Sequence, residues 1–547
     1  MPQPVTTIVP LALCLLVTAC SRERLERVVA RSPELPSRPA AGFGVSLPPV
    51  DSPGLSARQR DVVYLAHLLA AYYPDRDQLD TLTLTLRTRQ LLARLPGLPQ
   101  TDFAWRAALQ RFLAQLQDGH SYVDVPLYRA GEPYYSLSLL PSPDGQTLRV
   151  LALDSMVADT SLRGAEVISV NGHSVADVFA RVRSFHPGEN RYYKDHFLRR
   201  REPLPKYWRA LGVSDSDTLT LRLSAEADTS ATVRLVPHEN WRAWSTGADS
   251  LRFPFARENR RGFFRQYLPE RGVGYLQMNT SLDWAAMRTE VGNYVPFPLT
   301  PLAKGVLRRQ HKRRATLDFG RVVAEFFRRA AADSLARVIL DLRYNPGGDE
   351  RLGLQFIYYL AEAHRRDSLL APQTYYRFDG LLRDAVPGDY HRYRRAFAKT
   401  RGRDPRPEEW VALDREVLRR GFWQGIDAPE SPLYVDPTVP KFAGEVYVLT
   451  GPRTFSAASI LAATLQDNGL ATLVGEPTGN RPSGPTGASR IELPHTRTVI
   501  ALSYVRFDRA DATLNEMDAV YPDVPAPVTY ESLMRGGDPA LEAALDL

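Results

Sequence analysis

Ser456 has the residue type and the local pattern of a nucleophile at a helix N-terminus. The segment around it predicts a strand over 445–450, a helix from about 456 to 468 and a second strand over 471–475, because β-branched and aliphatic residues fill the strands while Ala, Leu and Gln fill the helix. The Ser456 hydroxyl would then lie where free backbone N–H groups and the helix dipole favour a developing negative charge. A helix cap is the competing interpretation, and only other parts of the chain can decide between the two.

A second turn of the same form follows the buried strand predicted over 338–342. It reads DLRYNPGG from Asp341 to Gly348, and glycines at such a turn let the backbone approach a ligand closely. Glycines there are common in α/β proteins, so this turn alone indicates little. Two such turns side by side in one sheet would form an oxyanion hole, with one N–H from Gly347 or Gly348 and one from Ala457.

The composition is that of a globular protein with several domains. At 547 residues the chain is too long for one core, so two to four domains are expected. The net charge of +7 is carried largely by arginine, and its densest run is Arg308–Arg314, in what reads as an insertion. No nucleic-acid fold signature accompanies that run, so we expect a solvated loop and no nucleic-acid partner.

The sequence lacks the motifs of several other enzyme classes. It contains no metal-ligand spacing, P-loop or GxGxxG pattern, which predicts that the protein uses no cofactor and no metal. It contains no G-x-S-x-G elbow either, which argues against an α/β-hydrolase esterase.

The N-terminal residues have the pattern of a lipoprotein precursor. Residues 5–19 form an apolar run that is too short to span a bilayer comfortably and that reads as the core of a signal peptide. Val17–Cys20 (VTAC) resembles the lipobox of bacterial lipoproteins, in which the Cys is acylated, although residues 1–10 contain no Lys or Arg. We therefore predict a signal peptide over 1–20, a lipid anchor at Cys20 and a location in the bacterial cell envelope, facing the periplasm or the outside.

Composition and hydrophobic periodicity divide the rest of the chain. Pro, Ser, Ala and Arg indicate a tether, apolar residues at helical spacing indicate helices, and alternating residues between turns indicate strands. The predicted units are a tether over 21–54, a helical domain over 55–130, a β-rich module over 131–240, and an α/β domain over 260–547 with insertions near 295–316 and 366–440.

Part of the β-rich module resembles the second half of a bacterial PDZ domain. GAEVISVNGHSVADVFARV at Gly164–Val182 predicts a strand, an Asn-Gly turn and a helix. Ala165 and Glu166 replace the usual Gly-Asp pair, and the first half of the module lacks the loop that binds a peptide carboxylate. The resemblance therefore does not establish that the module binds peptides by strand addition. Residues 185–213 interrupt the module with charged and aromatic residues to which the sequence assigns no function.

Three runs resemble the C-terminal processing peptidases and their tricorn-like relatives. They are VILDLRYNPGG, TFSAAS with the QDNG and LVGEPT that follow it, and the terminal YPDV with GGDPALEAAL. The resemblance covers roughly residues 55–545 in domain order and is specific in the α/β part. It implies a multidomain α/β fold: a crotonase-like catalytic domain with a PDZ-like β-rich module and an N-terminal helical domain.

The resemblance also implies roles for individual residues. In the family's SASASE signature the middle Ser is the nucleophile, which corresponds to Ser456, with Ser459 as the nearest alternative. One branch uses a Lys base in a T-F-G-K-G segment, but Arg481 stands at that place here. Because Arg stays protonated at any working pH, it cannot accept the Ser proton, and a Ser–Lys mechanism is improbable.

The tricorn-like branch supplies the other two residues. His120 in QDGHSYV matches the motif that carries the catalytic His, and Glu516 matches the acidic residue before the terminal PD motif, with Asp518 and Asp511 as rivals. A Ser hydroxyl needs a neutral imidazole to accept its proton, and a carboxylate fixes the imidazole tautomer.

The sequence therefore predicts a lipid-anchored serine endopeptidase acting on unfolded or C-terminal polypeptide segments. The alternative is a non-catalytic protein of the same fold that binds peptides or apolar ligands, and the replacement of Lys by Arg481 keeps it open. Neither the substrate nor the oligomeric state can be derived from the residues.

Overall fold

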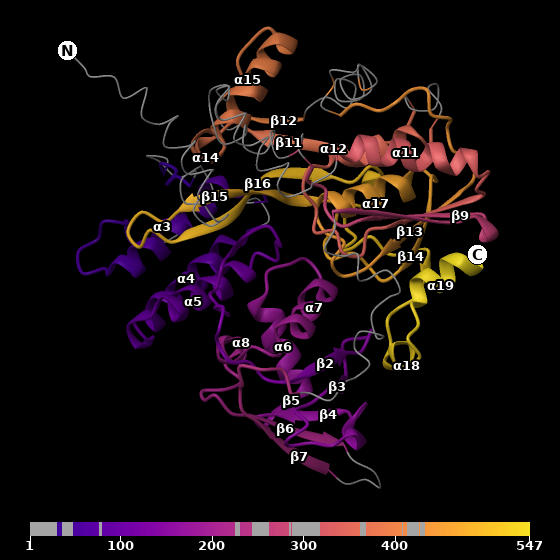
Figure 1. Cartoon of the computed structure of the whole chain (residues 1–547). Coiled ribbons are helices and arrows are strands. Elements are labelled where there is room, and N and C mark those ends of the chain that lie inside the picture. The colour runs from indigo at the N-terminus through magenta and orange to yellow at the C-terminus, as the bar shows by residue number, and fades with distance from the viewer. Residues whose placement is uncertain are drawn as a thin grey trace.

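The structure, a computed structural model, is shown in Figure 1. It describes residues 30–35, 47–75, 79–224, 230–242, 262–283, 286, 318–361, 368–406, 409–412, 426, 431 and 433–547. The predicted signal peptide with Cys20, most of the tether and the insertion near 295–316 lie outside these residues. Within the described ranges, no helix is long and apolar enough to cross a bilayer.

The C-terminal half is built on a six-stranded sheet in the order β17-β14-β13-β10-β9-β8. Its strands are β8 (Phe263–Leu268), β9 (Val273–Met278), β10 (Arg337–Asp341), β13 (Glu445–Thr450), β14 (Thr472–Gly475) and β17 (Val524–Pro525). All neighbours pair in parallel except β8, which runs antiparallel to β9. Nearly every residue of β9, β10 and β13 is buried, as expected for parallel strands covered on both faces.

Helices cover both faces of this sheet. The apolar faces of α11 (Phe319–Ala332), α12 (Arg351–Tyr358) and α17 (Ala457–Asp467) share one core with Leu340 and Val448. The C-terminal helix α19 (Pro539–Asp546) packs on the opposite face. Figure 1 shows this layering, with α11, α12 and α17 on one side of the strands and α19 on the other.

A second, antiparallel sheet carries a long hairpin away from the first. Its strands are β1 (Tyr122–Val123), β11 (Gln373–Arg377), β12 (Trp410–Ala412), β15 (Gly484–Glu492) and β16 (Val499–Asp508). Strands β11 and β12, with α14 (Gly380–Ala385) and α15 (Pro387–Arg401), fall within the segment 366–440. The polar composition of that segment predicts an insertion, yet its strand β11 pairs directly with β16, so this part belongs to the sheet.

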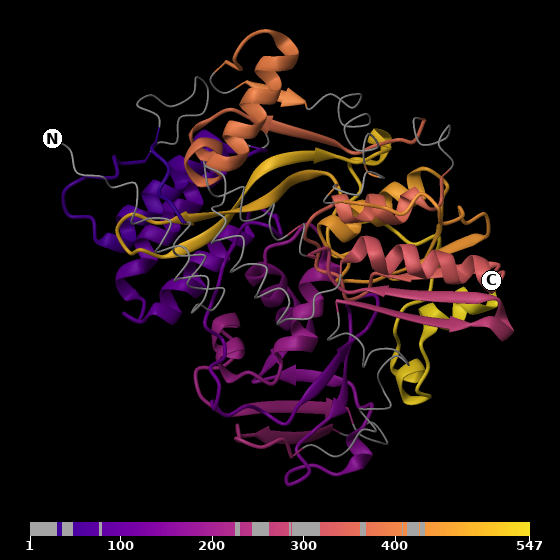
Figure 2. The same ribbon diagram turned by 45° about the horizontal axis from the view of Figure 1, so that its top comes forward.

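The helical domain packs on the hairpin β15–β16 (Figure 2). Its helices are α3 (Ala57–Tyr72), α4 (Thr81–Arg94) and α5 (Asp102–Ala114). Thr101 caps α5, because its hydroxyl accepts the Ala104 N–H. The Trp105 indole donates to Thr498 Oγ1 at 2.9 Å at the tip of the hairpin. The helical domain is therefore attached to the C-terminal part by both apolar and polar contacts.

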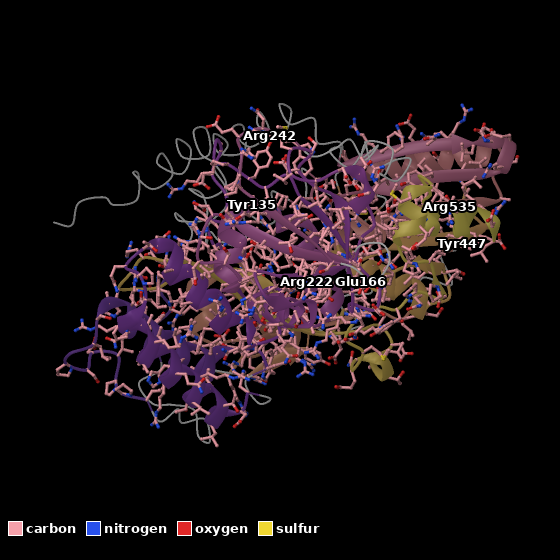
Figure 3. The ribbon with its side chains drawn as sticks, turned by 90° about the horizontal axis from the view of Figure 1, so that it is seen from below. Tyr135, Glu166, Arg222, Arg242, Tyr447 and Arg535 are labelled. Carbon is pink, nitrogen blue, oxygen red and sulfur yellow. The ribbon has the colours of Figure 1, made fainter. Side chains whose placement is uncertain are left out.

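The β-rich module combines a hairpin, a four-stranded antiparallel sheet and three helices. They are β2 (Ser138–Pro141), β3 (Leu148–Ala152), β4 (Val167–Val170), β5 (His173–Ser174), β6 (Leu219–Ser224), β7 (Ser230–Leu235), α6 (Val175–Phe185), α7 (Arg191–Arg201) and α8 (Pro205–Leu211). In Figure 3, Tyr135, Glu166, Arg222 and Arg242 mark this module, while Tyr447 and Arg535 mark the C-terminal part. Helix α18 (Tyr530–Met534) contacts the module, because Leu533 packs on β2 and β3.

Candidate active site

The backbone at Ser456 is strained. Ser456 links the loop after β13 to the first turn of α17 and has φ 55° and ψ −125°, a conformation that costs a non-glycine residue about 1–3 kcal/mol. Its N–H donates to Asn480 Oδ1 at 2.7 Å, and its side chain does not cap the helix. The competing interpretation of Ser456 as a helix cap is therefore wrong. The strained turn instead holds the hydroxyl out of the helix.

A network around Asp118 fixes the loop that carries His120. Asp118 Oδ1 accepts the His120 N–H at 2.9 Å. Asp118 Oδ2 accepts the hydroxyls of Tyr73, Ser121 and Ser503 at 3.2, 2.5 and 2.7 Å. Directly after the loop, β1 pairs with β16. Since Ser503 is part of β16, the loop is tied to the same sheet that reaches the C-terminal half.

The structure brings His120 and Ser456 together. His120 Nε2 lies 3.0 Å from Ser456 Oγ, although 336 positions separate the two residues. Burial lowers the pKa of His120, and the nearby Asp118 only partly opposes this shift. The imidazole is therefore neutral at neutral pH, as a general base must be. The Phe455 ring packs on it, with ring centroids 4.9 Å apart.

The two glycine turns meet beside Ser456. A Cβ on Gly347 would lie 2.6 Å from Ser456 Cβ and 3.0 Å from Ala457 N, so only glycine allows this approach. The Gly347 N–H donates to Asn345 Oδ1. Within the described residues, the N–H groups of Gly348 and Ala457 have no hydrogen-bond acceptor. Of the alternatives from the sequence, Gly348 with Ala457 is thus the pair left free for an oxyanion.

Two other residues singled out in the sequence have structural roles. The Ser459 hydroxyl is fully buried and lies 2.8 Å from both Thr454 O and Asn480 Oδ1, so it is not available to a substrate. Arg481, at the place of the family Lys, forms an ion pair with Asp75 at 3.5 Å. Asn480 was not predicted, and its position in the same TGNRP segment is the only signal that could have indicated it.

Glu516 requires a correction. Its side chain is exposed, and the structure gives it no hydrogen bond to His120. The turn is fixed through the preceding residue, because Asn515 Oδ1 accepts the Arg509 N–H and Asn515 O accepts the Ser483 hydroxyl. The rivals do not replace Glu516. Asp511 caps a short 3-10 helix and Asp518 accepts the Tyr521 hydroxyl.

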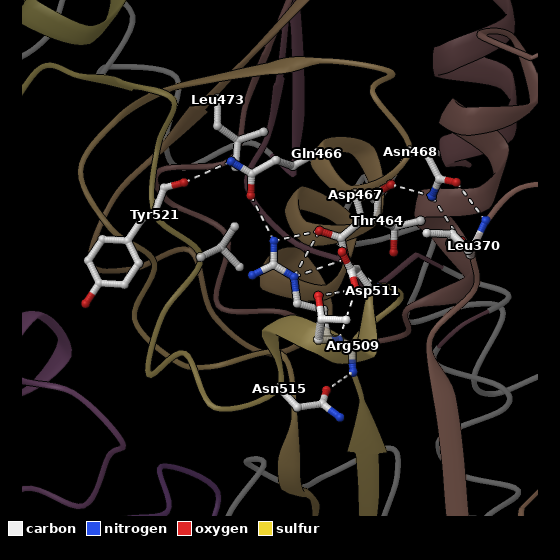
Figure 4. Close-up of polar contacts among 12 residues, drawn as sticks. Leu370, Thr464, Gln466, Asp467, Asn468, Leu473, Arg509, Asp511, Asn515 and Tyr521 are labelled. Atoms are coloured by element: carbon white, nitrogen blue, oxygen red, sulfur yellow. Dashed lines mark hydrogen bonds and ion pairs between the residues drawn. The ribbon is translucent and has the colours of Figure 1, made fainter.

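The chain around this turn is anchored to the end of α17 (Figure 4). Arg509 and Asp467 form a buried ion pair at 2.6 Å, and Arg509 also donates to Gln466 Oε1. The Asp511 N–H donates to Asp467 Oδ2 at 2.9 Å. Asp467 therefore orients the backbone of this turn, and the network stabilises the helix that begins after Ser456.

One acidic side chain near His120 has no counterpart in the sequence motifs. Asp118, His120 and Glu189 each place one potential ligand atom within 4.8 Å of the others, the one such group within the described part of the chain. Asp118 already accepts four hydrogen bonds, so its oxygens are poor candidates for a metal ligand. Glu189 belongs to the segment 185–213, which carries no periodic or motif signal that could have indicated it.

Comparison with known proteins gives a family match over part of the chain and a fold. Residues 310–526 match the sequence model of peptidase family S41. The chain is similar in structure to mature CPAF complexed with lactacystin, at 17% identity and a TM-score of 0.54, over 90% of this chain and 97% of that one. It is also similar to mature CPAF alone, at 17% identity and a TM-score of 0.53, over 90% and 95%. At this identity the likeness supports the fold alone, so the multidomain α/β prediction is confirmed, while the PDZ likeness stays a prediction. A search of the curated proteins found no match.

Proposed function

We propose that the protein is a serine peptidase that cleaves unfolded or C-terminal polypeptide segments in the bacterial cell envelope, since residues 310–526 match the sequence model of peptidase family S41. The observation that carries the proposal is the 3.0 Å separation of His120 Nε2 and Ser456 Oγ. A Ser hydroxyl at this distance from a neutral imidazole can lose its proton as it attacks a carbonyl.

The proposed reaction follows from the places of these groups. Ser456 Oγ attacks the scissile carbonyl while its proton passes to His120 Nε2, and the N–H groups of Gly348 and Ala457 stabilise the oxyanion. His120 then donates that proton to the leaving amine. Water hydrolyses the acyl-enzyme with His120 again as base. The side chain of Arg481 takes no part in proton transfer, because it stays charged and pairs with Asp75.

Envelope location rests on the sequence pattern at Val17–Cys20, and polypeptide substrates follow from the family. An acylated Cys20 would hold the enzyme at a membrane surface, where the predicted tether over 21–54 would let the folded part reach its substrates.

The test is fluorophosphonate labelling together with cleavage of an unfolded protein substrate. Wild type should label and cleave, while Ser456→Ala and His120→Ala should each lose activity by at least about 10³-fold. Exposed residues of the same types serve as controls, so Ser184→Ala and His391→Ala should match wild type. Labelling should appear in the membrane fraction for wild type and in the soluble fraction for Cys20→Ala. Equal activity in wild type, Ser456→Ala and His120→Ala would leave a non-catalytic binding protein as the better explanation.

A further inference from the structure

The His120 imidazole has an unpaired side. Its Nδ1 atom is buried and has no hydrogen-bond partner, whereas Nε2 faces Ser456. A buried donor without an acceptor costs about 1–3 kcal/mol, and native structures seldom leave one. A base that receives the Ser proton on Nε2 must also carry its own proton on Nδ1, so this atom needs an acceptor.

Asp118 is the nearest carboxylate in sequence, but its oxygens are already occupied. Its Oδ1 lies 3.8 Å from His120 Nδ1, beyond hydrogen-bond distance, and accepts the His120 backbone N–H instead. Its Oδ2 accepts three hydroxyl groups. Turning Asp118 toward the ring would break contacts that hold the loop, so its role is to fix the backbone of His120.

Glu189 offers the acceptor that is missing. Its Oε2 atom is buried and has no hydrogen-bond partner. One carboxylate oxygen lies within 4.8 Å of a ring nitrogen of His120, and a Cβ added to Gly119 would lie 3.5 Å from Oε2. The carboxylate thus packs against the loop that carries the base. The last torsion of a Glu side chain is broad, so a small rotation can close the remaining distance.

The chain around Glu189 is held firmly against the C-terminal part. The next residue, Asn190, donates to Thr478 O at 3.1 Å and to Asp518 O at 2.9 Å, and its Oδ1 caps α7. One turn later, Tyr193 stacks on Phe455 with ring centroids 4.6 Å apart. These contacts give the segment 185–213 a place beside the proposed catalytic pair.

We propose that Glu189 is the positioning residue of His120, accepting the Nδ1–H hydrogen bond and stabilising the imidazolium that forms when Ser456 attacks. This inference rests on the proposed function. The proton of Ser456 stops on Nε2 of His120 and the Nδ1 proton stays where it is, so Glu189 remains a carboxylate throughout the reaction. A protonated Glu189 would donate to Nδ1 instead, and would place the imidazole proton on the nitrogen that faces Ser456.

The surroundings of Glu189 determine how the pair titrates. Burial, with a smaller contribution from Asp118, raises the pKa of Glu189 to about 8, although Arg481 and the backbone N–H groups of Glu189 and Gly119 oppose the rise. Other titratable groups that sense its charge are Tyr73, Tyr193 and Lys194. Because the active form needs Glu189 ionised and His120 neutral, activity should fall as the pH drops below about 8. In a plot of activity against pH, the fall on the acid side should therefore have its midpoint well above the ordinary pKa of a carboxyl group. This fall is called the acid limb below.

The experiment compares pH profiles of kcat and KM for wild type and carboxylate variants. Glu189→Gln should lower kcat by about 10²- to 10⁴-fold with KM within about threefold, because the loss is confined to stabilisation of the imidazolium. Its acid limb should move to lower pH, since only His120 with its lowered pKa remains to titrate. Glu189→Asp should recover part of kcat. Glu132→Gln, in the same module and paired with Lys206, is the matched control and should keep the wild-type profile.

Glu516→Gln tests the competing assignment. The proposal would be overturned if Glu516→Gln lowered kcat as much as Glu189→Gln, or more. It would also be overturned if Glu189→Gln had a normal melting temperature and the acid limb of its pH profile stayed at the wild-type pH. Should Glu189→Gln fail to fold, Glu189→Asp supplies the same comparison of limb and kcat. If Ser456→Ala is inactive while Glu189→Gln matches wild type, the peptidase assignment stands and this inference fails. If Ser456→Ala stays active, the proposed function itself fails.

Discussion

Replacing Ser456 by Gly should stabilise the protein relative to Ser456→Ala, although neither variant should be active. Both changes remove the hydroxyl and its contact with His120 Nε2, so the difference between them isolates the backbone. At φ 55° and ψ −125° an alanine keeps the strain of the native serine, whereas glycine adopts this conformation readily.

The expected size follows from two opposing terms. Relief of the strained conformation contributes about 1–3 kcal/mol, and the extra freedom of glycine in the unfolded chain costs about 0.5–1 kcal/mol. The Gly variant should therefore exceed the Ala variant by about 1 kcal/mol, within a range of roughly 0 to 2.5 kcal/mol. For a cooperative unit of 150–250 residues this corresponds to about 2–4 °C in melting temperature.

Urea and thermal unfolding of the two variants measure this difference. The control is the same pair of substitutions at Ser459, which lies inside α17 with helical neighbours. There Ser459→Gly should be less stable than Ser459→Ala by about 1 kcal/mol, as glycine is in any helix interior. The sign of the Gly–Ala difference should thus reverse between two positions three residues apart. If Ser456→Gly is also the less stable variant by about 1 kcal/mol, the strained turn does not exist and the reasoning is refuted.

Two further predictions concern the glycine turn at Gly347 and the partly buried Glu476. Gly347→Ala should lower kcat by at least about 10²-fold, because its Cβ would lie 2.6 Å from Ser456 Cβ. The control Gly402→Ala should keep the wild-type kcat, because the space around Gly402 is open. An unchanged kcat in Gly347→Ala would contradict the geometry. Burial raises the pKa of Glu476 to about 7, so its contribution to stability is full below about pH 4.5 and is lost as the pH rises through 7. The free energy of unfolding in urea should therefore rise in Glu476→Gln relative to wild type, by about 2 kcal/mol more at pH 8.5 than at pH 5.5. An equal rise at the two pH values would exclude a Glu476 that is uncharged in the folded protein.

Local sequence patterns predicted the elements around Ser456 well. The expected strand over 445–450 is β13, the expected helix from about 456 to 468 is α17 at 457–467, and the expected strand over 471–475 is β14 at 472–475. These elements are set by residue type and by periodicity over a few turns, so tertiary contacts had little to override.

The carboxylate beside the imidazole could not be predicted in the same way. Glu516 was selected by its place in a motif, but its neighbour Asn515 is fixed by Arg509 and Ser483 so that the acid faces solvent. Glu189 lies within 4.8 Å of His120 because the turn before α7 packs against the C-terminal part, and no periodicity within 185–213 encodes that packing. The packing of whole domains decides which carboxylate lies beside the imidazole. Motifs and periodicity in a single sequence do not specify that packing.

The range that matches the family model contains only some of the residues proposed for catalysis. The matching range, 310–526, contains Ser456 and the glycines of the oxyanion turn, but it contains neither His120 nor Glu189. The proposed base, His120, comes from the helical domain, which is joined to the C-terminal half by the pairing of β1 with β16. The proposed positioning acid, Glu189, comes from the β-rich module, which is joined to the C-terminal half through Asn190. A chain that lacked the β1–β16 pairing or the contacts of Asn190 would match the family model equally well. Its serine would then have no positioned base to accept the hydroxyl proton. Activity in this protein should therefore depend on the packing of all three parts against one another. The domain boundary most sensitive to mutation should be the one at Asn190, where two hydrogen bonds join the module to the backbone of Thr478 and Asp518.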